Sequence, residues 1–242
     1  MTSVHILVIS LKDSQGRKER VSAEMAKTPF EWQFLEAVDG RTLDLSTVAY
    51  DAAKVKRLLG FQLTPKEIGC YLSHMAAWRF CVATQQTTLI FEDDFVIEPH
   101  FETVVNTLVD SYASWDIVRL QALCDSACSS VKTFGEFALV QNESDPLGAT
   151  AYLVNPESAQ CLLDASTDIF EPLDHYIEHH QKHGQMMLAV IPYPVTVADP
   201  TRQTSTITDR PDRLPIRGMR KFGRSLYRML DRLGSSRPWF PR

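Results

Sequence analysis

The sequence of 242 residues has no run of about eighteen apolar residues, the length that a membrane-spanning helix needs. It also lacks the features of a secretion signal, because MTSVHILVISLKD has no positively charged start, only a short apolar run and no small-residue cleavage site. A hydrophobic content of 44% and a charged content of 23% exclude a disordered or fibrous chain. The sequence therefore predicts a globular protein whose first apolar run is a core strand.

Cysteine and glycine are both scarce. The five cysteines are odd in number and scattered, and only Cys124 and Cys128 lie close together, so the cysteines complete no zinc site. This pattern favours reduced thiols in a cytosolic protein. After the first apolar run, LKDSQGRKER contains only Gly16, which argues against the glycine-rich phosphate loop expected of a nucleotidyltransferase.

Positive charge is concentrated at the C-terminal end, and the rest of the chain is acidic. The formal net charge is −5. Residues 217–242 contain eight basic residues and one acidic residue, which gives +7, so the other 216 residues carry −12. Such a body is a poor nucleic-acid binder, whereas the basic tail is expected to bind an anionic surface.

Apolar runs alternate with helical patterns along most of the chain. Residues 4–11 are typical of a strand covered on both faces, 14–27 predict a helix, and 31–38 predict a second strand. Strand, helix and strand at this spacing predict a parallel sheet. We further expect helices over 64–84, 100–113, 156–165 and 172–184, strands over 88–91, 116–121, 147–155 and 186–191, a hairpin or irregular strand over 132–142, and a loop or lid over 193–213.

The helix expected over 64–84 begins with a capping pattern and contains two unusual polar residues. Thr64 suits the N-cap, and Glu67 falls three residues later, as in a capping box. Ser73 and His74 interrupt an otherwise apolar segment. Taken alone, His74 fits a core histidine with a satisfied hydrogen bond better than a metal ligand.

The run Glu92-Asp93-Asp94 follows the apolar strand over 88–91 directly. Three adjacent carboxylates are unfavourable to bury, because like charges then repel with little water to screen them. A bound divalent cation would resolve this repulsion, and carboxylate oxygens suit Mg²⁺ or Mn²⁺. Because open α/β sheets bind ligands at the carboxyl ends of their strands, the run is placed for such a site. A solvated acidic loop explains the three residues alone equally well.

A second cluster lies in the helix expected over 172–184. His175, His179 and His183 recur every four residues and so share one helix face. That spacing can bind zinc, but there is no HExxH order and no strong fourth ligand. We interpret these residues as a solvated histidine face.

Seven short motifs follow one another through the chain. They are the ISL strand with Arg17 and Arg20, Ala37-Val38-Asp39-Gly40, Leu63 to Gly69 with Ser73-His74, Leu89 to Asp94, Gly148 to Val154, Pro172-Leu173-Asp174, and Ser205-Thr206-Ile207. Each motif is weak alone, but their shared order is specific. In this order the chain resembles glycosyltransferase family 25, the bacterial lipopolysaccharide and lipooligosaccharide glycosyltransferases related to collagen galactosyltransferases. The basic tail falls outside the resemblance.

The resemblance implies an α/β fold with a GT-A-like (Rossmann-like) mixed sheet flanked by helices. It also implies a UDP-sugar donor, usually UDP-galactose, a divalent cation, Mn²⁺ or Mg²⁺, and inversion at the anomeric carbon. We expect the glycosyltransferase domain over 1–215 and a basic amphipathic helix in the tail, 216–242.

The same resemblance assigns roles to the acidic run. Asp94 is expected to contact the metal directly, and Asp93 to orient its two neighbours. Glu92 is expected to join the metal site and to bind the ribose or act through water. Because the chain has glutamate at the first position of a motif often written DxD, the role of Glu92 is the least determined of the three.

Further residues are expected at the nucleotide. Arg17 and Arg20 lie just past the first strand, where a guanidinium can pair with phosphate, although an exposed helix face explains them as well. Asp39 and Gly40 would contact uracil or ribose, or form only a tight turn. The donor-binding set implied by the motifs is completed by Ser73, His74, Arg202 and Ser205. The last two belong to the predicted loop, which would close over the donor and exclude water, unless it is a plain surface loop.

An inverting transfer needs a general base that removes the proton of the acceptor hydroxyl. Asp174 is our candidate for this base, since it follows Pro172 in one of the motifs and would begin a helix. The alternative is a capping aspartate that stabilises the helix by about 1 kcal/mol and has no catalytic role.

The tail spaces its cations three or four residues apart beside an apolar side, as do helices that lie in the headgroup layer of anionic membranes. We therefore expect a cytoplasmic protein bound to the inner face of the bacterial inner membrane, where a lipid-linked acceptor is found. The alternative is a terminal helix packed on the domain with its cations in water.

Together these features predict an inverting, metal-dependent glycosyltransferase. It would move a hexose, galactose by preference, from a UDP-sugar to the saccharide of a lipopolysaccharide or lipooligosaccharide core. The competing hypotheses are a nucleotidyltransferase and a non-catalytic lipid-surface or scaffolding protein that keeps the fold.

Overall fold

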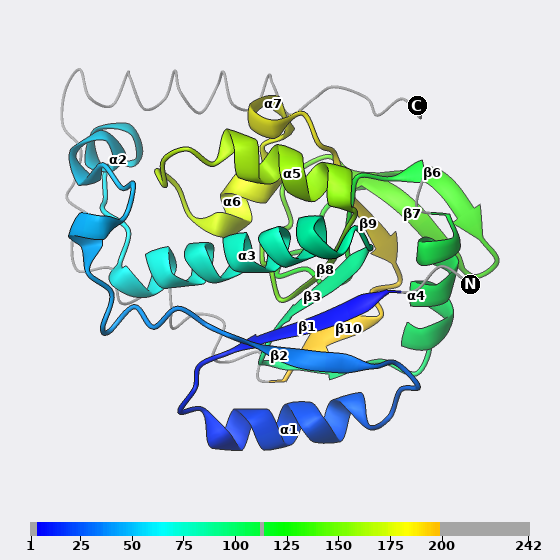
Figure 1. Ribbon diagram of the computed structural model, residues 1–242. Helices are drawn as coiled ribbons and strands as arrows, with labels where there is room; N and C mark the ends of the chain where they lie inside the picture. The colour runs from blue at the N-terminus through cyan, green and yellow to red at the C-terminus, as the bar shows by residue number, and fades with distance from the viewer. Residues whose placement is uncertain (1–3, 112–113, 199–242) are drawn as a thin grey trace.

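The computed structural model describes residues 4–111 and 114–198, which form a mixed β-sheet flanked by helices (Figure 1). The eight strands of the main sheet lie in the order β2-β1-β3-β8-β5-β9-β7-β6. Their bounds are β1 His5–Ser10, β2 Trp32–Glu36, β3 Thr88–Glu92, β5 Ile117–Arg119, β6 Cys128–Phe134, β7 Phe137–Asn142, β8 Ala151–Val154 and β9 Met187–Ile191. A second, two-stranded sheet pairs β4 Phe95–Ile97 with β10 Val195–Val197. The expected α/β fold is confirmed.

The strands β1, β2 and β3 are parallel, as are β5 and β9, while β8 runs antiparallel between β3 and β5. Strands β1, β3, β5 and β9 therefore end at the same edge of the sheet. The antiparallel β8 begins at that edge. The residues that follow β1, β3, β5 and β9 therefore lie close to the residues that precede β8.

The helices cover both faces of the sheet. In Figure 1, α3 and α5 lie on one face, and α1 and α4 on the other. The bounds of the helices are α1 Gln15–Met25, a 3₁₀ turn at Leu45–Thr47, α2 Ala52–Leu59, α3 Pro65–Thr84, α4 Phe101–Asp110, α5 Pro156–Ala165, α6 Leu173–Glu178 and α7 His180–His183. Across the described ranges, no helix is long and apolar enough to cross a membrane.

Two hydrophobic cores share the sheet. Along β1, Leu7 and Ile9 belong to the core that contains α3, α5 and α6, whereas Ile6 and Val8 belong to the core that contains α1 and α4. Successive strand residues point to opposite faces, so a strand covered on both sides must be apolar throughout. This explains the continuous apolar run at the start of the chain.

Local signals set the ends of α3. The side chain of Thr64 accepts a hydrogen bond from the Glu67 N–H, and the Glu67 side chain accepts one from the Thr64 N–H, which is a complete capping box. At the other end, Gln85 takes the left-handed conformation with φ 54° and stops the helix. The helix expected over 64–84 is confirmed, and so are the hairpin and the helix over 156–165.

The histidine-rich segment differs from the expectation. The predicted helix over 172–184 is two short helices, α6 and α7, interrupted at His179. The interpretation as a solvated histidine face is wrong, because His179 and His183 are 4% and 6% exposed. His179 is buried beside Glu171, whose carboxylate lies 2.9 Å from its ring nitrogen. Helical spacing within the segment cannot predict this contact, because Glu171 precedes the helix.

Other elements were not expected from the sequence. These are α2, with the 3₁₀ turn before it, and the short strands β4 and β10. Most of the predicted loop over 193–213 and all of the tail, 216–242, lie outside the described residues.

Candidate active site

The acidic run lies at the edge of the main sheet where β1, β3 and β5 end. The main-chain N–H of Glu92 donates to the carbonyl of Thr150, just before β8, at 2.9 Å. The carbonyl of Asp94 accepts from the N–H of Ala198 at 2.7 Å, next to β10. The run is therefore held by main-chain hydrogen bonds on both sides.

Asp93 is bound by the protein itself. Its carboxylate accepts hydrogen bonds from the Ser10 hydroxyl at 2.7 Å and from Nη1 of Arg17 at 2.6 Å. Its carbonyl accepts one from Nη2 of Arg20 at 2.6 Å. Asp93 thus ties the run to β1 and α1. Both arginines lie at the acidic run, and the Arg17 side chain remains 51% exposed.

Asp94 has the opposite environment. Its Oδ1 is buried without a hydrogen-bond partner in the described part of the chain. Burial, together with the charges of Glu92 and Asp93, raises the pKa of Asp94 to about 6. A buried carboxylate that lacks a partner is costly unless a cation or a ligand joins it. This oxygen is therefore suited to contact a positively charged group.

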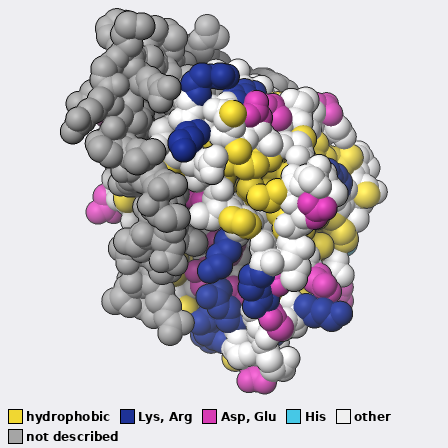
Figure 2. Space-filling view, turned by 90° about the vertical axis from the view of Figure 1, so that its left-hand side faces the viewer, with side chains coloured by type: hydrophobic (Ala, Val, Ile, Leu, Met, Phe, Trp, Pro, Cys, Tyr) yellow, Lys and Arg dark blue, Asp and Glu magenta, His cyan; other side chains and the backbone are white. Residues whose placement is uncertain are grey.

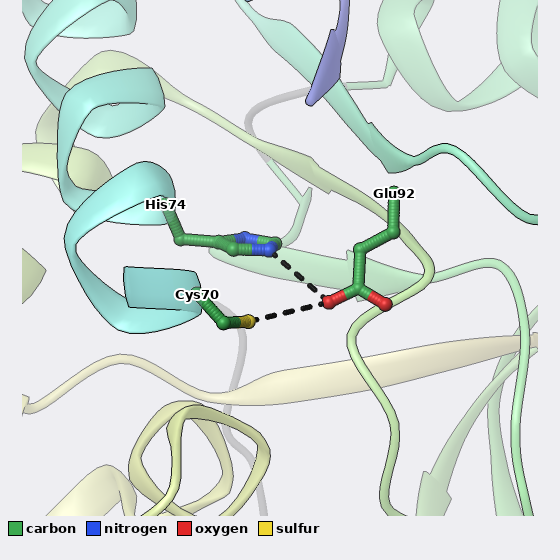
Figure 3. Close-up of side chains that lie close together, drawn as sticks. All are labelled: Cys70, His74 and Glu92. Atoms are coloured by element: carbon green, nitrogen blue, oxygen red, sulfur yellow. Dashed lines mark hydrogen bonds and ion pairs between the residues drawn. The ribbon is translucent and has the colours of Figure 1, made fainter. Parts of the chain in front are cut away.

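Glu92 faces α3. Its Oε1 lies 3.5 Å from the Cys70 thiol and 3.5 Å from Nε2 of His74, and the three side chains converge in Figure 3. Burial favours a higher pKa for Glu92, but the contacts with His74 and Cys70 outweigh it and lower the pKa. Glu92 is therefore a carboxylate with one oxygen turned toward α3 and with 32% of its side chain exposed.

The loop after β2 packs against the first turns of α3. Ser73 donates to the Gly69 carbonyl at 2.7 Å and accepts from the Val38 N–H at 2.8 Å. A Cβ on Gly40 would lie 2.3 Å from the Pro65 carbonyl oxygen, so only glycine fits there. Ser73 and Gly40 thus hold this loop in place. Its neighbour Asp39 pairs with Arg41, which also reaches Asp13.

Asp174 lies in the first turn of α6, and its Oδ1 accepts from the His175 N–H at 3.0 Å. Burial, with the charges of Glu92 and Asp174, raises the pKa of the Cys70 thiol well above its usual range. Tyr176 of the same helix packs against Tyr71 of α3, with ring centroids 5.3 Å apart, so α6 lies against the helix that carries Cys70. Arg202 and Ser205 lie outside the described residues.

Four further residues belong to this edge: Ser10, Cys70, Gln121 and Tyr152. Ser10 was the most accessible to prediction, since it ends the first strand. Gln121 is 2% exposed, and neither atom of its amide has a hydrogen-bond partner within the described ranges. Tyr152 contacts His74, and that pairing joins two segments 78 residues apart. No local pattern signals Gln121, and the motif over 148–154 contains Tyr152 without revealing its partner.

The view in Figure 2 shows the side of the molecule that is on the left in Figure 1, with Lys and Arg side chains gathered in its lower half beside Asp and Glu. Arg17 and Arg41 come from α1 and from the loop after β2, and each side chain is about half exposed, at 51% and 54%. Basic and acidic side chains thus lie side by side on this face.

A family model described as glycosyltransferase family 25 (LPS biosynthesis protein) matches residues 3–177, which is more than half of the chain. The chain belongs to glycosyltransferase family 25. The resemblance carried by the ordered motifs is thereby confirmed, and the acidic run, α3 and Asp174 all lie within the matched residues.

Curated relatives of this family 25 member include human procollagen galactosyltransferase 2, which is 26% identical over 173 residues. That match covers 66% of this chain and 27% of the human protein. The mouse inactive glycosyltransferase 25 family member 3 is 32% identical over 127 residues, which cover 48% of this chain and 21% of the mouse protein. The chain thus spans only about a quarter or a fifth of these relatives.

Solved structures resemble this family 25 member only distantly. A glycosyltransferase involved in the glycosylation of the major capsid of PBCV-1 gives a TM-score of 0.44 at 9% identity, over 85% of this chain and 99% of that one. A putative glucose-1-phosphate thymidylyltransferase from Bacillus anthracis gives 0.40 at 9% identity, over 87% and 78%. Both likenesses are too low to support a function.

Proposed function

We propose that this family 25 member is an active, metal-dependent glycosyltransferase. It moves a hexose, galactose by preference, from a UDP-sugar to the saccharide of a lipopolysaccharide or lipooligosaccharide core, with inversion. The buried Oδ1 of Asp94, which has no hydrogen-bond partner in the described part of the chain, is the observation that carries the proposal. It lies at the sheet edge where α/β proteins bind ligands.

The side chains at this edge fit a divalent cation. Asp94 and Glu92 would hold Mn²⁺ or Mg²⁺, because both offer carboxylate oxygens and Asp94 has an oxygen to spare. When bound, the ion would neutralise the negative charge that develops on the diphosphate leaving group. Asp93 contributes by fixing the run, since its own carboxylate is already bound to Ser10 and Arg17.

The donor nucleotide is assigned to the side of the loop after β2. Arg17, half exposed beside the acidic run, is placed to attract the diphosphate. Asp39 and Gly40 are proposed to contact uracil or ribose, and they lie on a loop that Ser73 holds against α3. Arg202 and Ser205 remain proposed members of a closing loop.

Asp174 is the proposed general base. In the transfer, the acceptor oxygen forms a bond to the anomeric carbon as the bond from that carbon to the UDP oxygen breaks, and Asp174 takes the proton of the acceptor hydroxyl. A base separate from Glu92 and Asp94 is required, because those two carboxylates are committed to the cation. If Asp174 has this role, Asp174→Asn lowers kcat by about 10²–10⁴-fold with little change in the affinity for UDP.

The decisive test is calorimetric titration with UDP, with and without Mn²⁺, followed by measurement of UDP release from UDP-galactose with a lipooligosaccharide core acceptor. We expect binding that needs Mn²⁺, and turnover that Asp94→Ala abolishes. The matched control is Asp110→Ala on the exposed end of α4, which leaves both unchanged. Full turnover by Asp94→Ala would refute the metal assignment.

A second candidate function is a non-catalytic member that keeps the fold at a lipid surface. It is favoured by one observation, that the relatives at 32% identity include a protein named as inactive. The absence of UDP binding in both titrations would support this alternative. A parallel assay with a collagen peptide as acceptor separates the core saccharide from the acceptor suggested by the name of the human relative.

A further inference from the structure

The geometry points to His74 as a positioning residue whose Nε2–H fixes the carboxylate of Glu92, with the tautomer of His74 set by the buried pair Trp78 and Tyr152. The contacts among Trp78, Tyr152 and His74 are given by the structure alone, whereas their effect on catalysis depends on the proposed function. Nothing in the ordered motifs assigns Trp78 or Tyr152 a role at the site.

Three side chains from α3 and β8 form a buried hydrogen-bonded chain. The indole Nε1 of Trp78 lies 2.9 Å from the hydroxyl oxygen of Tyr152, and that oxygen lies 2.8 Å from Nδ1 of His74. All three residues are 0% exposed. None of the three side chains is open to bulk water, so their hydrogen-bond partners must come from the protein interior.

The positions of the protons follow from counting donors and acceptors. An indole N–H can only donate, so the Tyr152 oxygen accepts from Trp78. The Tyr152 hydroxyl then needs an acceptor for its own proton, and within the described ranges Nδ1 of His74 is its other hydrogen-bonding neighbour. If Nδ1 carried a proton, the Tyr152 hydroxyl proton would be buried without a partner, at a substantial cost. Nδ1 is therefore the acceptor, and the proton of neutral His74 is on Nε2.

This proton points at Glu92. Nε2 of His74 lies 3.5 Å from Oε1 of Glu92 and has no hydrogen-bond partner in the described part of the chain (Figure 3). A shift of Glu92 by roughly half an ångström would make this a hydrogen bond of ordinary length. Glu92 is partly exposed and can make that shift. After that shift, His74 and Cys70 would both hold Oε1, and Oε2 would be left for the ribose or the cation.

The same three ligand atoms, from Cys70, His74 and Glu92, lie within 4.8 Å of one another, as in a transition-metal site. The proton count argues against that use. A metal would need the lone pair of Nε2, which would move the His74 proton to Nδ1 and leave the Tyr152 hydroxyl without an acceptor. The arrangement thus favours a donor to Glu92.

The first measurement is independent of activity. The full chain is labelled with ¹⁵N-histidine, and long-range ¹H–¹⁵N correlations are recorded, with the His74 signals identified by their loss in His74→Gln. We expect a protonated-type shift at Nε2 and an unprotonated-type shift at Nδ1. The reverse pattern, or a shift of Nε2 on adding Zn²⁺ that reports coordination, would overturn the inference.

The second measurement tests the consequence for the donor. Because partners that orient a ligand typically affect affinity or activity about 10–100-fold, His74→Phe should raise the KM for the UDP-sugar and the Mn²⁺ requirement by that factor. His74→Gln, which keeps an N–H near the Nε2 position, should recover most of the loss. The control is His5→Gln at the opposite end of β1, which should change neither value.

The outcomes separate the two proposals. If wild-type protein binds no UDP with Mn²⁺, the proposed function fails, while the tautomer measurement still decides the hydrogen-bonded chain. If wild-type protein is active and His74→Phe matches it, the positioning role is wrong. If His74→Phe does not fold, the comparison of His74→Gln with wild type and the tautomer decide the matter.

Discussion

Neighbouring aspartates in the acidic run have different environments. Asp93 accepts hydrogen bonds from Ser10 and Arg17, whereas Asp94 has a buried oxygen without such a partner in the described residues. The negative charge of the Asp93 carboxylate therefore stabilises the fold, whereas that of Asp94 destabilises it. The same substitution, Asp to Asn, should therefore have opposite effects on stability one residue apart.

At Asp94, the predicted effect depends on pH. The pKa of Asp94 is raised to about 6 in the folded protein, because of burial and the charges of Glu92 and Asp93, against about 3.9 in an unfolded chain. The stability from the protonated form is fully present below the unfolded value and is lost as pH rises through about 6. Asp94→Asn should thus raise the free energy of unfolding by about 1–3 kcal/mol at pH 7.5 without metal.

This gain should shrink as pH falls toward 4, because Asp94 of the folded wild-type protein is then protonated and as neutral as the asparagine of the variant. Urea denaturation in EDTA between pH 4 and pH 8 measures it. Mn²⁺ should stabilise wild-type protein and leave Asp94→Asn unchanged. A gain that is the same at every pH would contradict the environment assigned to Asp94.

At Asp93, the same substitution should cost stability. Asp93→Asn replaces a charge-assisted pair with a neutral contact, and we expect a loss of about 1–2 kcal/mol. The lower end of that range applies because Arg17 is half exposed and solvent screens the pair. The measurement is the urea midpoint at pH 7.5, and a gain in stability there would show that Asp93 is not the anchor of the run.

At the scale of elements, the contact between the loop after β2 and α3 is made by backbone, and it leaves no room for a side chain. A Cβ on Gly40 would meet the Pro65 carbonyl at 2.3 Å, and one on Gly69 would meet the Val38 carbonyl at 2.6 Å. Either change would force the loop away from the helix that carries Ser73. Since the loop is proposed to bind the nucleotide, its displacement should reach the donor site.

Gly40→Ala should therefore destabilise the protein by about 1–3 kcal/mol and weaken UDP binding. The matched control is Gly16→Ala in α1, where an added Cβ meets nothing within 4 Å. That control should be neutral or more stable by up to about 1 kcal/mol. Urea midpoints and UDP titrations distinguish the two variants, and equal behaviour would show that the loop can move without cost.

Elements with local signals were predictable from sequence, and elements made by distant pairing were not. The capping box of α3 spans four residues, so the sequence alone predicts where this helix begins. Helix α2 also has ordinary signals, a capping Asp51 and a left-handed Gly60, and these signals are local enough to predict it from sequence. In contrast, β4 exists because it pairs with β10, about a hundred residues later in the chain. Three residues carry too little periodicity to reveal such a partner.

The same limit applies to the site. The acidic run could be placed at a strand end from sequence, since a strand and three carboxylates are adjacent in the chain. The contrast between Asp93 and Asp94, and the contact of His74 with Glu92, depend on tertiary neighbours from β1, α1 and α3. The sequence thus predicts which ionisable groups lie at the site, but it does not predict the hydrogen-bond partner of each group.

At the scale of the whole molecule, the sheet separates two cores, and its carboxyl edge collects the polar groups that neither core can hold. The apolar faces of β1 are filled on both sides, whereas Ser10 and Glu92 emerge at the ends of β1 and β3. The site is therefore built on strand ends that are fixed by packing. That rigidity suits a reaction whose rate depends on holding donor and acceptor in one geometry.

Charge is also divided at this scale, between an acidic body and a tail of eight basic residues and one acidic residue. We expect the tail to hold the protein on anionic membranes, at about 1 kcal/mol for each cation near the surface. Replacing Arg220, Lys221, Arg224 and Arg228 by glutamine should abolish sedimentation with vesicles that contain phosphatidylglycerol. High salt should have the same effect on the wild-type protein, because it screens surface charge.

Turnover on a soluble core oligosaccharide should be unchanged in this variant, because the substitutions lie beyond every residue that is proposed to bind donor or acceptor. Turnover on the lipid-linked acceptor in vesicles should fall, because the enzyme is no longer concentrated at the surface. Equal loss on both acceptors would mean that the tail supports the domain itself. Retained vesicle binding would instead show that another part of the chain meets the membrane.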